Sequence, residues 1–213
     1  MNKKIIFLIG IGRSGTSLLS NCLINNGFSI GKTKNNDKNW QNPNGYFEND
    51  SFTSIHDKLL SYNASKWNNI TKDKMGYTKT HVNEYRNLLE REFNGDDKIL
   101  IKDPRITFFT DFLKEVCEGK YKPYFIFCTR DRHECCISLS KAQNMTYEDC
   151  GKLYDVTHNY YSDEFLKIDH GDTIHNNSET IKKISDFYGF EIKKDTSEVV
   201  DLNLYRNRKN EEL

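Results

Sequence analysis

The sequence predicts an α/β fold with a parallel β-sheet flanked by helices, and two observations support this. Short apolar runs rich in β-branched or aromatic residues stand at 5–9, 99–101 and 123–129. Runs of this length and composition are typical of strands buried on both faces. Amphipathic helical patterns separate these runs. Strands that alternate with helices indicate a parallel sheet with right-handed crossovers.

The first predicted strand, residues 5–9, leads into a glycine-rich turn and then a helix. Glycines at positions 10, 12 and 15 punctuate the turn. The helix after the turn carries its apolar residues on one side and has a glycine placed to end it: Leu18, Leu19, Cys22 and Leu23, then Gly27. A strand, a glycine loop and a helix N-terminus gather backbone N–H groups and the positive end of a helix dipole. Such a point binds an anion, most often a phosphate.

The spacing of this turn matches the P-loop pattern G-x-x-x-x-G-K-[ST] at every position but one. Gly10 and Gly15 bracket four residues and Ser17 takes the hydroxyl position, but Thr16 stands where the pattern has lysine. That lysine normally contacts the β- and γ-phosphates of ATP. The cation here is Arg13, inside the loop. We therefore expect a P-loop-like sheet that binds a nucleotide phosphate without hydrolysing ATP.

The remaining elements follow from apolar periodicity and turn residues. Helices are predicted over 50–62, 80–93, 108–117 and 132–143, with a longer helix over about 146–168. Residues 28–30 are expected to be briefly extended, and 32–44 to form a polar loop. A last strand is predicted at 173–175, before a helix that Ser178 would cap.

Cationic residues follow each of the three apolar runs. Arg13 comes after the first, Lys102-Asp-Pro-Arg105 after the second, and Arg130 after the third. In open α/β sheets, ligands bind beyond the carboxyl ends of the strands. The sequence therefore predicts one shared anionic ligand at this edge.

The glycine loop also resembles a family motif. Gly12-Arg-Ser-Gly-Thr-Ser-Leu18 is similar to the 5′-phosphosulfate loop of the sulfotransferase superfamily, which binds 3′-phosphoadenosine 5′-phosphosulfate (PAPS). A large bacterial branch of that family reads H-R-S-G-T-S. The resemblance implies that Arg13 stabilises the leaving phosphate and that backbone N–H groups hold the phosphosulfate. The loop residues it implies for PAPS binding are Gly12, Arg13, Ser14, Gly15, Thr16 and Ser17.

Arg130 and Ser138 resemble the family's 3′-phosphate motif, an arginine at a strand end and a serine on the next helix. An arginine fork and a hydroxyl can grip a phosphate dianion together. One departure is Arg132, which stands where the family usually has proline. The alternative is structural, with Arg130 paired to Asp131 and Ser138 on a helix surface.

Lys102-Asp-Pro-Arg105 matches the K-D-P-R that the bacterial branch commonly carries after a strand. Arg105 is expected to hold the sulfate or the acceptor, with Asp103 orienting it. The alternative is a structural network of salt bridges. This structural role suits Asp103 better than Arg105.

Glu48 is the predicted catalytic base. Asn42-Pro-Asn-Gly-Tyr-Phe-Glu-Asn49 resembles the family stretch N-P-x-G-[FY]-[FW]-E, whose glutamate is given that role. Transfer of a sulfuryl group to an alcohol needs a group that takes the hydroxyl proton. Alternatively, Glu48 only stabilises the start of the next helix through its dipole. His56 and His81 are the rival bases.

The C-terminal tail resembles the terminal basic segment of the same branch. The resemblance implies that Arg206 and Arg208, with Lys209, close over the 3′-phosphate. A solvated basic tail is the alternative.

Composition narrows the function classes. Lys plus Arg and Asp plus Glu number 31 each, so no global basic field calls for nucleic acid or an anionic membrane. The six cysteines form no C-x-x-C pair, and no metal site is expected. They are expected to be small buried hydrophobes in a reducing compartment. No segment is long enough to span a bilayer. We expect a soluble, cytoplasmic protein with one domain over residues 1–213.

The sequence thus predicts a PAPS-dependent sulfotransferase that releases adenosine 3′,5′-bisphosphate (PAP) and needs no metal. The alternatives are a P-loop nucleotide kinase or NTPase, and a non-catalytic nucleotide-binding module. Residue types fit a carbohydrate, a lipid or a small phenol acceptor equally. The aromatic residues that could stack on it are Trp40, Tyr46, Trp67 and Tyr77. The oligomeric state is left open.

Overall fold

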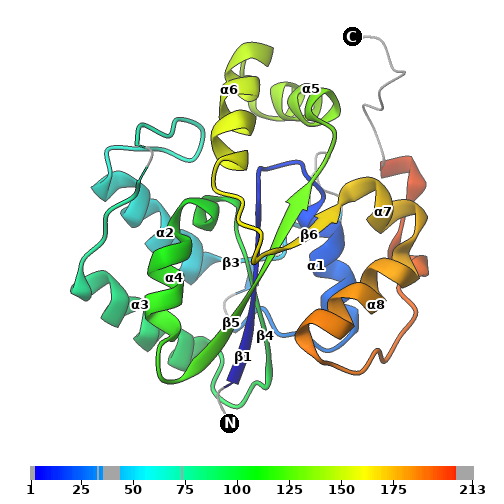
Figure 1. The fold of residues 1–213 in the computed structure, drawn as a ribbon, viewed down its shortest axis with the longest axis horizontal. Helices are drawn as coiled ribbons and strands as arrows, with labels where there is room; N and C mark the ends of the chain where they lie inside the picture. Colours follow the sequence, from blue (N-terminus) through cyan, green and yellow to red (C-terminus); the bar gives the residue numbers. More distant parts are fainter. Residues whose placement is uncertain (1–2, 33, 36–43, 73, 205–213) are drawn as a thin grey trace.

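The computed structural model describes residues 3–32, 34–35, 44–72 and 74–204. At its centre is a four-stranded parallel sheet with the strand order β4-β1-β5-β6 (Figure 1). The strands are β1 (Lys3–Gly10), β4 (Lys98–Lys102), β5 (Tyr121–Thr129) and β6 (Leu166–Asp169). The predicted fold class is confirmed.

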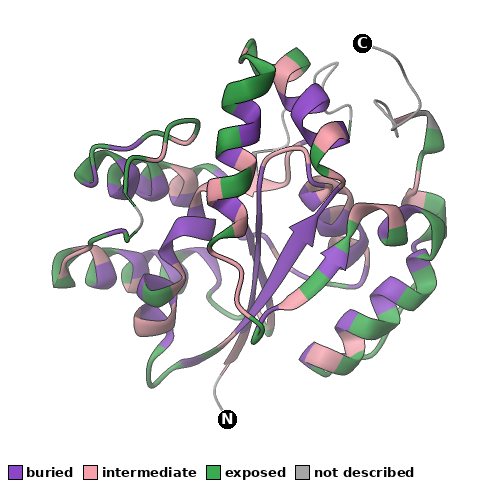
Figure 2. Cartoon of the chain, turned by 45° about the horizontal axis from the view of Figure 1, so that its top comes forward, coloured by how far each residue is buried: buried purple, intermediate pink, exposed green. Residues whose placement is uncertain are grey.

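Strand β1 lies between β4 and β5 and is almost completely buried (Figure 2). Its side chains alternate between two cores. Ile5 and Phe7 join the core on one face of the sheet, and Ile6 and Leu8 join the core on the other. Burial on both faces is why the strand reads as an unbroken apolar run.

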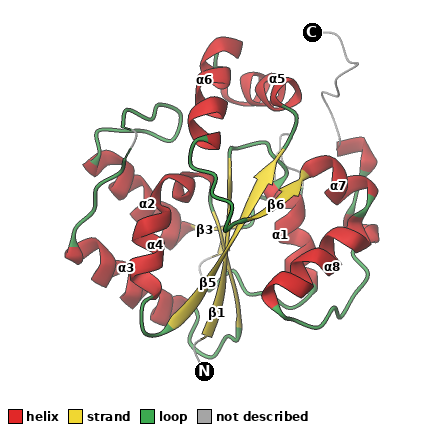
Figure 3. Ribbon diagram, in the orientation of Figure 1, coloured by secondary structure: helices red, strands yellow, loops and turns green. Residues whose placement is uncertain are grey.

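Helices cover both faces of the sheet (Figure 3). One layer holds α2 (Asp50–Tyr62), α3 (Lys79–Glu92) and α4 (Thr110–Cys117). The other holds α1 (Thr16–Asn25), α7 (His170–His175) and α8 (Asn177–Tyr188). Two more helices, α5 (Arg132–Gln143) and α6 (Tyr147–His158), lie beyond the end toward which β5 points. Helices α2 and α5 have the predicted bounds.

Three predictions for the C-terminal third are wrong. The helix predicted over 146–168 ends at His158, and its last residues instead belong to β6, which pairs with β5. Residues 173–175, predicted as a strand, lie in α7. Ser178 lies inside α8, whose N-cap is Asn176. Strand β6 is a four-residue edge strand, so pairing with β5 decides its state more than its own pattern does.

Shorter elements complete the described chain. A bridge between Ser29 and Ile99 confirms the brief extension predicted at 28–30. Strand β2 (Lys34–Asn35) pairs antiparallel with β3 (Glu48–Asn49). The 3₁₀ helices are η1 (Pro104–Phe109), η2 (Ser197–Val199) and η3 (Leu202–Leu204). Within the described ranges, no helix is long and apolar enough to cross a membrane.

Candidate active site

A cavity of about 450 Å³ lies at the carboxyl edge of the sheet. The segment after each of the four strands contributes to its wall. These contributions are the glycine loop after β1, Asp103 to Arg105 after β4, Arg130 after β5, and His170 after β6. Parallel strands in register bring these segments together, which is the usual ligand position in such sheets. The three cationic motifs predicted to share a ligand therefore share one cavity.

The loop between β1 and α1 allows close approach of the backbone. Gly10 has a φ of +132°, and a Cβ there would lie 2.5 Å from the carbonyl oxygen of Cys128. Its N–H donates to Thr107 Oγ1 at 2.8 Å. Gly15, with a φ of +93°, is the N-cap of α1 and has no side chain to satisfy the first N–H groups of the helix. Thr16, the first residue of α1, lines the cavity, so the N-terminus of α1 brings the positive end of its dipole to the cavity wall.

Ser14 is the loop residue whose polar groups bond within the turn. Its side chain is buried, and its Oγ donates to the Ile11 carbonyl at 2.7 Å. Its N–H also donates to that carbonyl, at 3.3 Å. Ser14 therefore closes the turn. The loop residues that line the cavity are Gly12, Arg13, Gly15, Thr16 and Ser17.

The structure brings together the predicted phosphate-binding side chains. Arg13 has the positive φ of 71°, uncommon for a residue with a Cβ, and its Nε donates to Ser138 Oγ at 3.1 Å. Arg130 Nη1 donates to the Arg13 carbonyl at 3.4 Å. Its Nε pairs with Glu134 at 3.0 Å, while Asp131 caps α5. Ser138 is buried rather than on a helix surface.

Glu48 lies on the cavity wall, where Lys102 holds it. The carboxylate Oε1 is 2.6 Å from Lys102 Nζ, which also donates to the Tyr46 carbonyl at 3.1 Å. Oε2 is 3.9 Å from Arg105 Nη1. Phe47, just before Glu48, has a φ of 56° in the left-handed region, and such residues concentrate at functional sites. Lys102 belongs to the K-D-P-R match but was not among the predicted site residues.

Asp103 sits at the centre of a buried polar network. It accepts from Arg105 Nη1 at 2.8 Å and lies 2.8 Å from His56 Nδ1, whose other ring nitrogen is 3.0 Å from Tyr85 Oη. Burial alone would raise the pKa of Asp103. The hydrogen bond and charge of His56, together with Arg105, outweigh that effect and lower the pKa to about 2. Arg105 also pairs with Asp57 at 3.0 Å. Asp103 thus holds Arg105 at the cavity, as the structural alternative proposed.

The two rival bases lie elsewhere. His56 is completely buried in the network around Asp103. His81 closes a capping box with Thr78 at the start of α3. Neither is among the described residues that line the cavity, whereas Glu48 is.

His170 lines the cavity but was not predicted as a site residue. It follows Asp169, the end of β6, and is the first residue of α7. Burial, followed by the positive charges of Arg130 and Arg13, lowers its pKa to about 3. His170 could have been identified from the sequence as a histidine that directly follows an aspartate at the end of a strand. It was missed because residues 166–168 were read as helix.

The candidate aromatic residues separate into two groups. Tyr46 and Trp67 line the cavity. The Tyr77 hydroxyl donates to Glu115 at 3.0 Å and its ring packs against Phe112, so it covers the core. Trp40 lies outside the described residues.

The predicted basic tail also lies outside the described residues, and with it Arg206, Arg208 and Lys209. The residues that precede this tail lie at the site, since Asp201 and Leu204 line the cavity.

The six cysteines are all free and buried. Burial raises the pKa of Cys117 and of Cys135 to about 12, so both thiols stay protonated at neutral pH. Across the described part of the chain, no group of three or more His, Cys, Asp or Glu side chains could hold a metal ion.

Solved structures with the same architecture exist. No protein-family model matches the sequence, and no curated protein matches it significantly. The sulfotransferase domain from the Synechococcus PCC 7002 olefin synthase matches with a TM-score of 0.56 and 14% identity, covering 97% of this chain and 84% of that one. The sulfotransferase domain from the curacin biosynthetic pathway matches with a TM-score of 0.53 and 16% identity, covering 89% and 75%. At these identities the likeness establishes the fold, and the chain has the sulfotransferase fold.

Proposed function

We propose that this chain is a PAPS-dependent sulfotransferase that moves a sulfuryl group to a hydroxyl or amine of a small-molecule, carbohydrate or lipid acceptor. One observation carries the proposal. A single cavity combines an anion-binding end, made of the N-terminus of α1 with Arg13 and Arg130, with a carboxylate, Glu48, suited to accept a proton.

The residues present fit a nucleotide that bears two phosphate groups. Gly15 caps α1 without a side chain, so backbone N–H groups at the start of α1 can approach a 5′-phosphate. Arg130 and Ser138 would hold the 3′-phosphate, and both lie in contact with Arg13. PAPS, as the donor substrate, supplies the sulfuryl group on its 5′-phosphate.

Each catalytic residue has a distinct task. Glu48 takes the proton from the acceptor as the new bond forms, and Lys102 fixes the position of its carboxylate. Arg13 stabilises the negative charge that develops on the leaving phosphate. Arg105, held by Asp103, stabilises the sulfuryl group or the acceptor.

We also propose that residues 1–213 form one domain, because β1 lies inside the sheet and Leu204 lines the cavity. A cytoplasmic location fits six free, buried thiols, which suit a reducing compartment. The basic tail is proposed to close over the 3′-phosphate, because the described chain leads to the cavity at Leu204.

Transfer of ³⁵S-labelled sulfuryl from PAPS to a panel of phenols, amino sugars and long-chain alcohols tests the proposal. We expect labelled product with at least one acceptor class, formed at least about a hundredfold more slowly by Glu48→Gln. A nucleotide-binding module would bind PAP equally well in both proteins and label no acceptor. A kinase would bind ATP in preference to PAP, although Thr16 replaces the P-loop lysine.

A further inference from the structure

The His170 imidazole packs directly on the glycine loop. A Cβ built on Gly15 would lie 2.3 Å from His170 Nδ1 and 2.9 Å from its Cγ. Nδ1 is shielded from solvent, and His170 lines the cavity. Because Gly15 caps α1, the imidazole lies beside the backbone N–H groups proposed to receive the 5′-phosphate.

Positive charge faces His170 from several elements. Arg13 comes from the glycine loop, Arg130 from the end of β5, and His175 from the far end of α7. The positive charge of Arg130 is partly compensated by its ion pair with Glu134. Burial, followed by the charges of Arg130 and Arg13, keeps the imidazole neutral.

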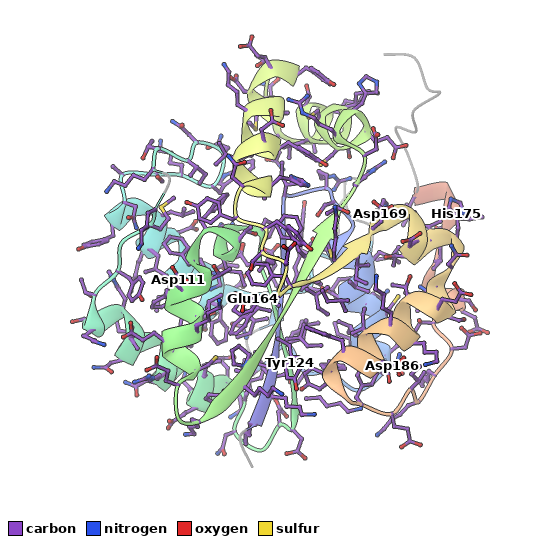
Figure 4. All side chains as sticks on the ribbon, in the orientation of Figure 1. Asp111, Tyr124, Glu164, Asp169, His175 and Asp186 are labelled. Atoms are coloured by element: carbon purple, nitrogen blue, oxygen red, sulfur yellow. The ribbon has the colours of Figure 1, made fainter. Side chains whose placement is uncertain are left out.

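Three acidic side chains also lie in this part of the molecule. Asp169, at the start of α7 in Figure 4, accepts from Gly171 N at 2.8 Å and from Thr129 Oγ1 at 3.2 Å. Asp172 lies in the first turn of α7 and Asp201 on the cavity wall.

We propose that His170 contacts the 5′-phosphate of the bound nucleotide and takes up one proton from solvent when that phosphate binds. This inference rests on the proposed function. A phosphate at the start of α1 would lie between His170 and the two arginines, and a dianion there reverses the sign of the local field. The imidazolium then donates a charge-assisted hydrogen bond to the phosphate. The proton passes from solvent to the imidazole, and no covalent bond changes.

Protonation of His170 also affects the release of the product. Transfer of the sulfuryl group leaves an additional negative charge on the 5′-phosphate, so the imidazolium binds the product PAP more strongly than the donor. Release of PAP is therefore coupled to loss of the His170 proton, and it should become slower as the pH falls.

Calorimetric titration with PAP in two buffers of different ionisation enthalpy tests the proposal. The number of protons taken up is measured from pH 6 to pH 8 for wild type, His170→Gln and His81→Gln. PAP has its own titrating phosphates, which contribute equally to all three, so differences report on the protein. His81, which lies outside the cavity lining, is the matched control, because a glutamine can also close its capping box at the start of α3.

We expect wild type and His81→Gln to take up most of one proton more than His170→Gln near pH 6. His170→Gln should bind PAP about tenfold to a hundredfold more weakly at pH 6, with a smaller difference at pH 8. Equal proton uptake in all three proteins overturns the role of His170 while leaving the sulfotransferase proposal intact. If wild type does not bind PAP, both proposals fail.

A second measurement covers the case in which His170→Gln does not fold. The ring ¹⁵N resonances of wild-type His170 report its protonation directly. We expect a neutral ring in the free protein and an imidazolium in the PAP complex at pH 6. A ring that stays neutral in the complex overturns the proposal.

Discussion

Lys102 Nζ lies 2.6 Å from Glu48 Oε1, and both side chains are mostly buried at the cavity wall. The ion pair uses one carboxylate oxygen and leaves Oε2, 3.9 Å from Arg105 Nη1, as the oxygen that can accept a proton. The base is thus held by one cation and faces a second. This arrangement makes the role of Glu48 separable from that of the phosphate-binding residues.

Glu48→Gln should lower the sulfuryl-transfer rate by about 10²- to 10⁴-fold, because an amide cannot take the acceptor proton. Binding of PAP should change by less than about threefold, since the cations beside Glu48 are Lys102 and Arg105, and neither is a proposed phosphate-binding residue. Initial rates and PAP titrations check both expectations. The matched control is Glu90→Gln, whose surface pair with Lys120 has the same 2.6 Å separation and should leave both quantities unchanged. An active Glu48→Gln enzyme would remove Glu48 as the base.

Gly15→Ala should destabilise the fold strongly. The new Cβ would meet His170 and would also require a left-handed backbone, so we expect a loss of about 3 kcal/mol or more. Gly27→Ala is the control, because Gly27 has a similar φ of +88° but nothing within 4 Å, and should cost about 1 kcal/mol. Urea denaturation measures both. Equal losses would show that His170 does not pack on the loop as described.

Asp103→Asn should change how stability depends on pH. The folded-state pKa of Asp103, about 2, lies below its unfolded value. Its contribution, about 2 kcal/mol, is therefore complete above about pH 4 and is lost as the pH falls toward 2. The stability gap between wild type and the variant should narrow over that range in urea denaturation. Asp57→Asn, at the exposed partner of Arg105, should show no such narrowing, and a gap independent of pH would contradict the buried network.

The cysteines should be inert in the folded protein. All six are buried, and burial raises the pKa of Cys150 to about 11 and of Cys135 to about 12. A thiol reagent such as Ellman's reagent should label none of them at pH 7.5 within minutes and all six in urea. Rapid labelling of one thiol in the native protein would show that its site opens locally.

Most of the sheet could be predicted because its strands carry their own signal. Strands β1, β4 and β5 appear in the sequence as apolar runs, and α2 and α5 have the predicted ends because their caps, Asn49 and Asp131, satisfy the first helical N–H groups.

Strand β6 could not be predicted in the same way. It is a short edge strand with one fully buried residue, Ile168, and its pattern continues that of the preceding helix. Its pairing with β5 is tertiary information. Since His170 follows β6, missing the strand also meant missing His170.

The candidate site was predictable as far as its residues lie in local motifs. Arg13, Arg130 and Glu48 each stand in such a stretch, and the fold places all three at one cavity. The contact between His56 and Asp103 joins residues 47 positions apart, so no local pattern could reveal it. Sequence alone therefore left His56 as a rival base, whereas the structure buries it against Asp103 and places Glu48 at the cavity.

Calorimetric binding of PAP and ATP tests the central claim most directly. The proteins are wild type, Glu134→Gln, and Glu134→Gln combined with Arg130→Ala, which avoids leaving the Glu134 carboxylate buried without Arg130. We predict that wild type and Glu134→Gln bind PAP at least tenfold more tightly than ATP, and that the double variant loses more than tenfold in PAP affinity. Preference for ATP, unaffected by the loss of Arg130, would contradict the sulfotransferase assignment and favour a nucleotide kinase.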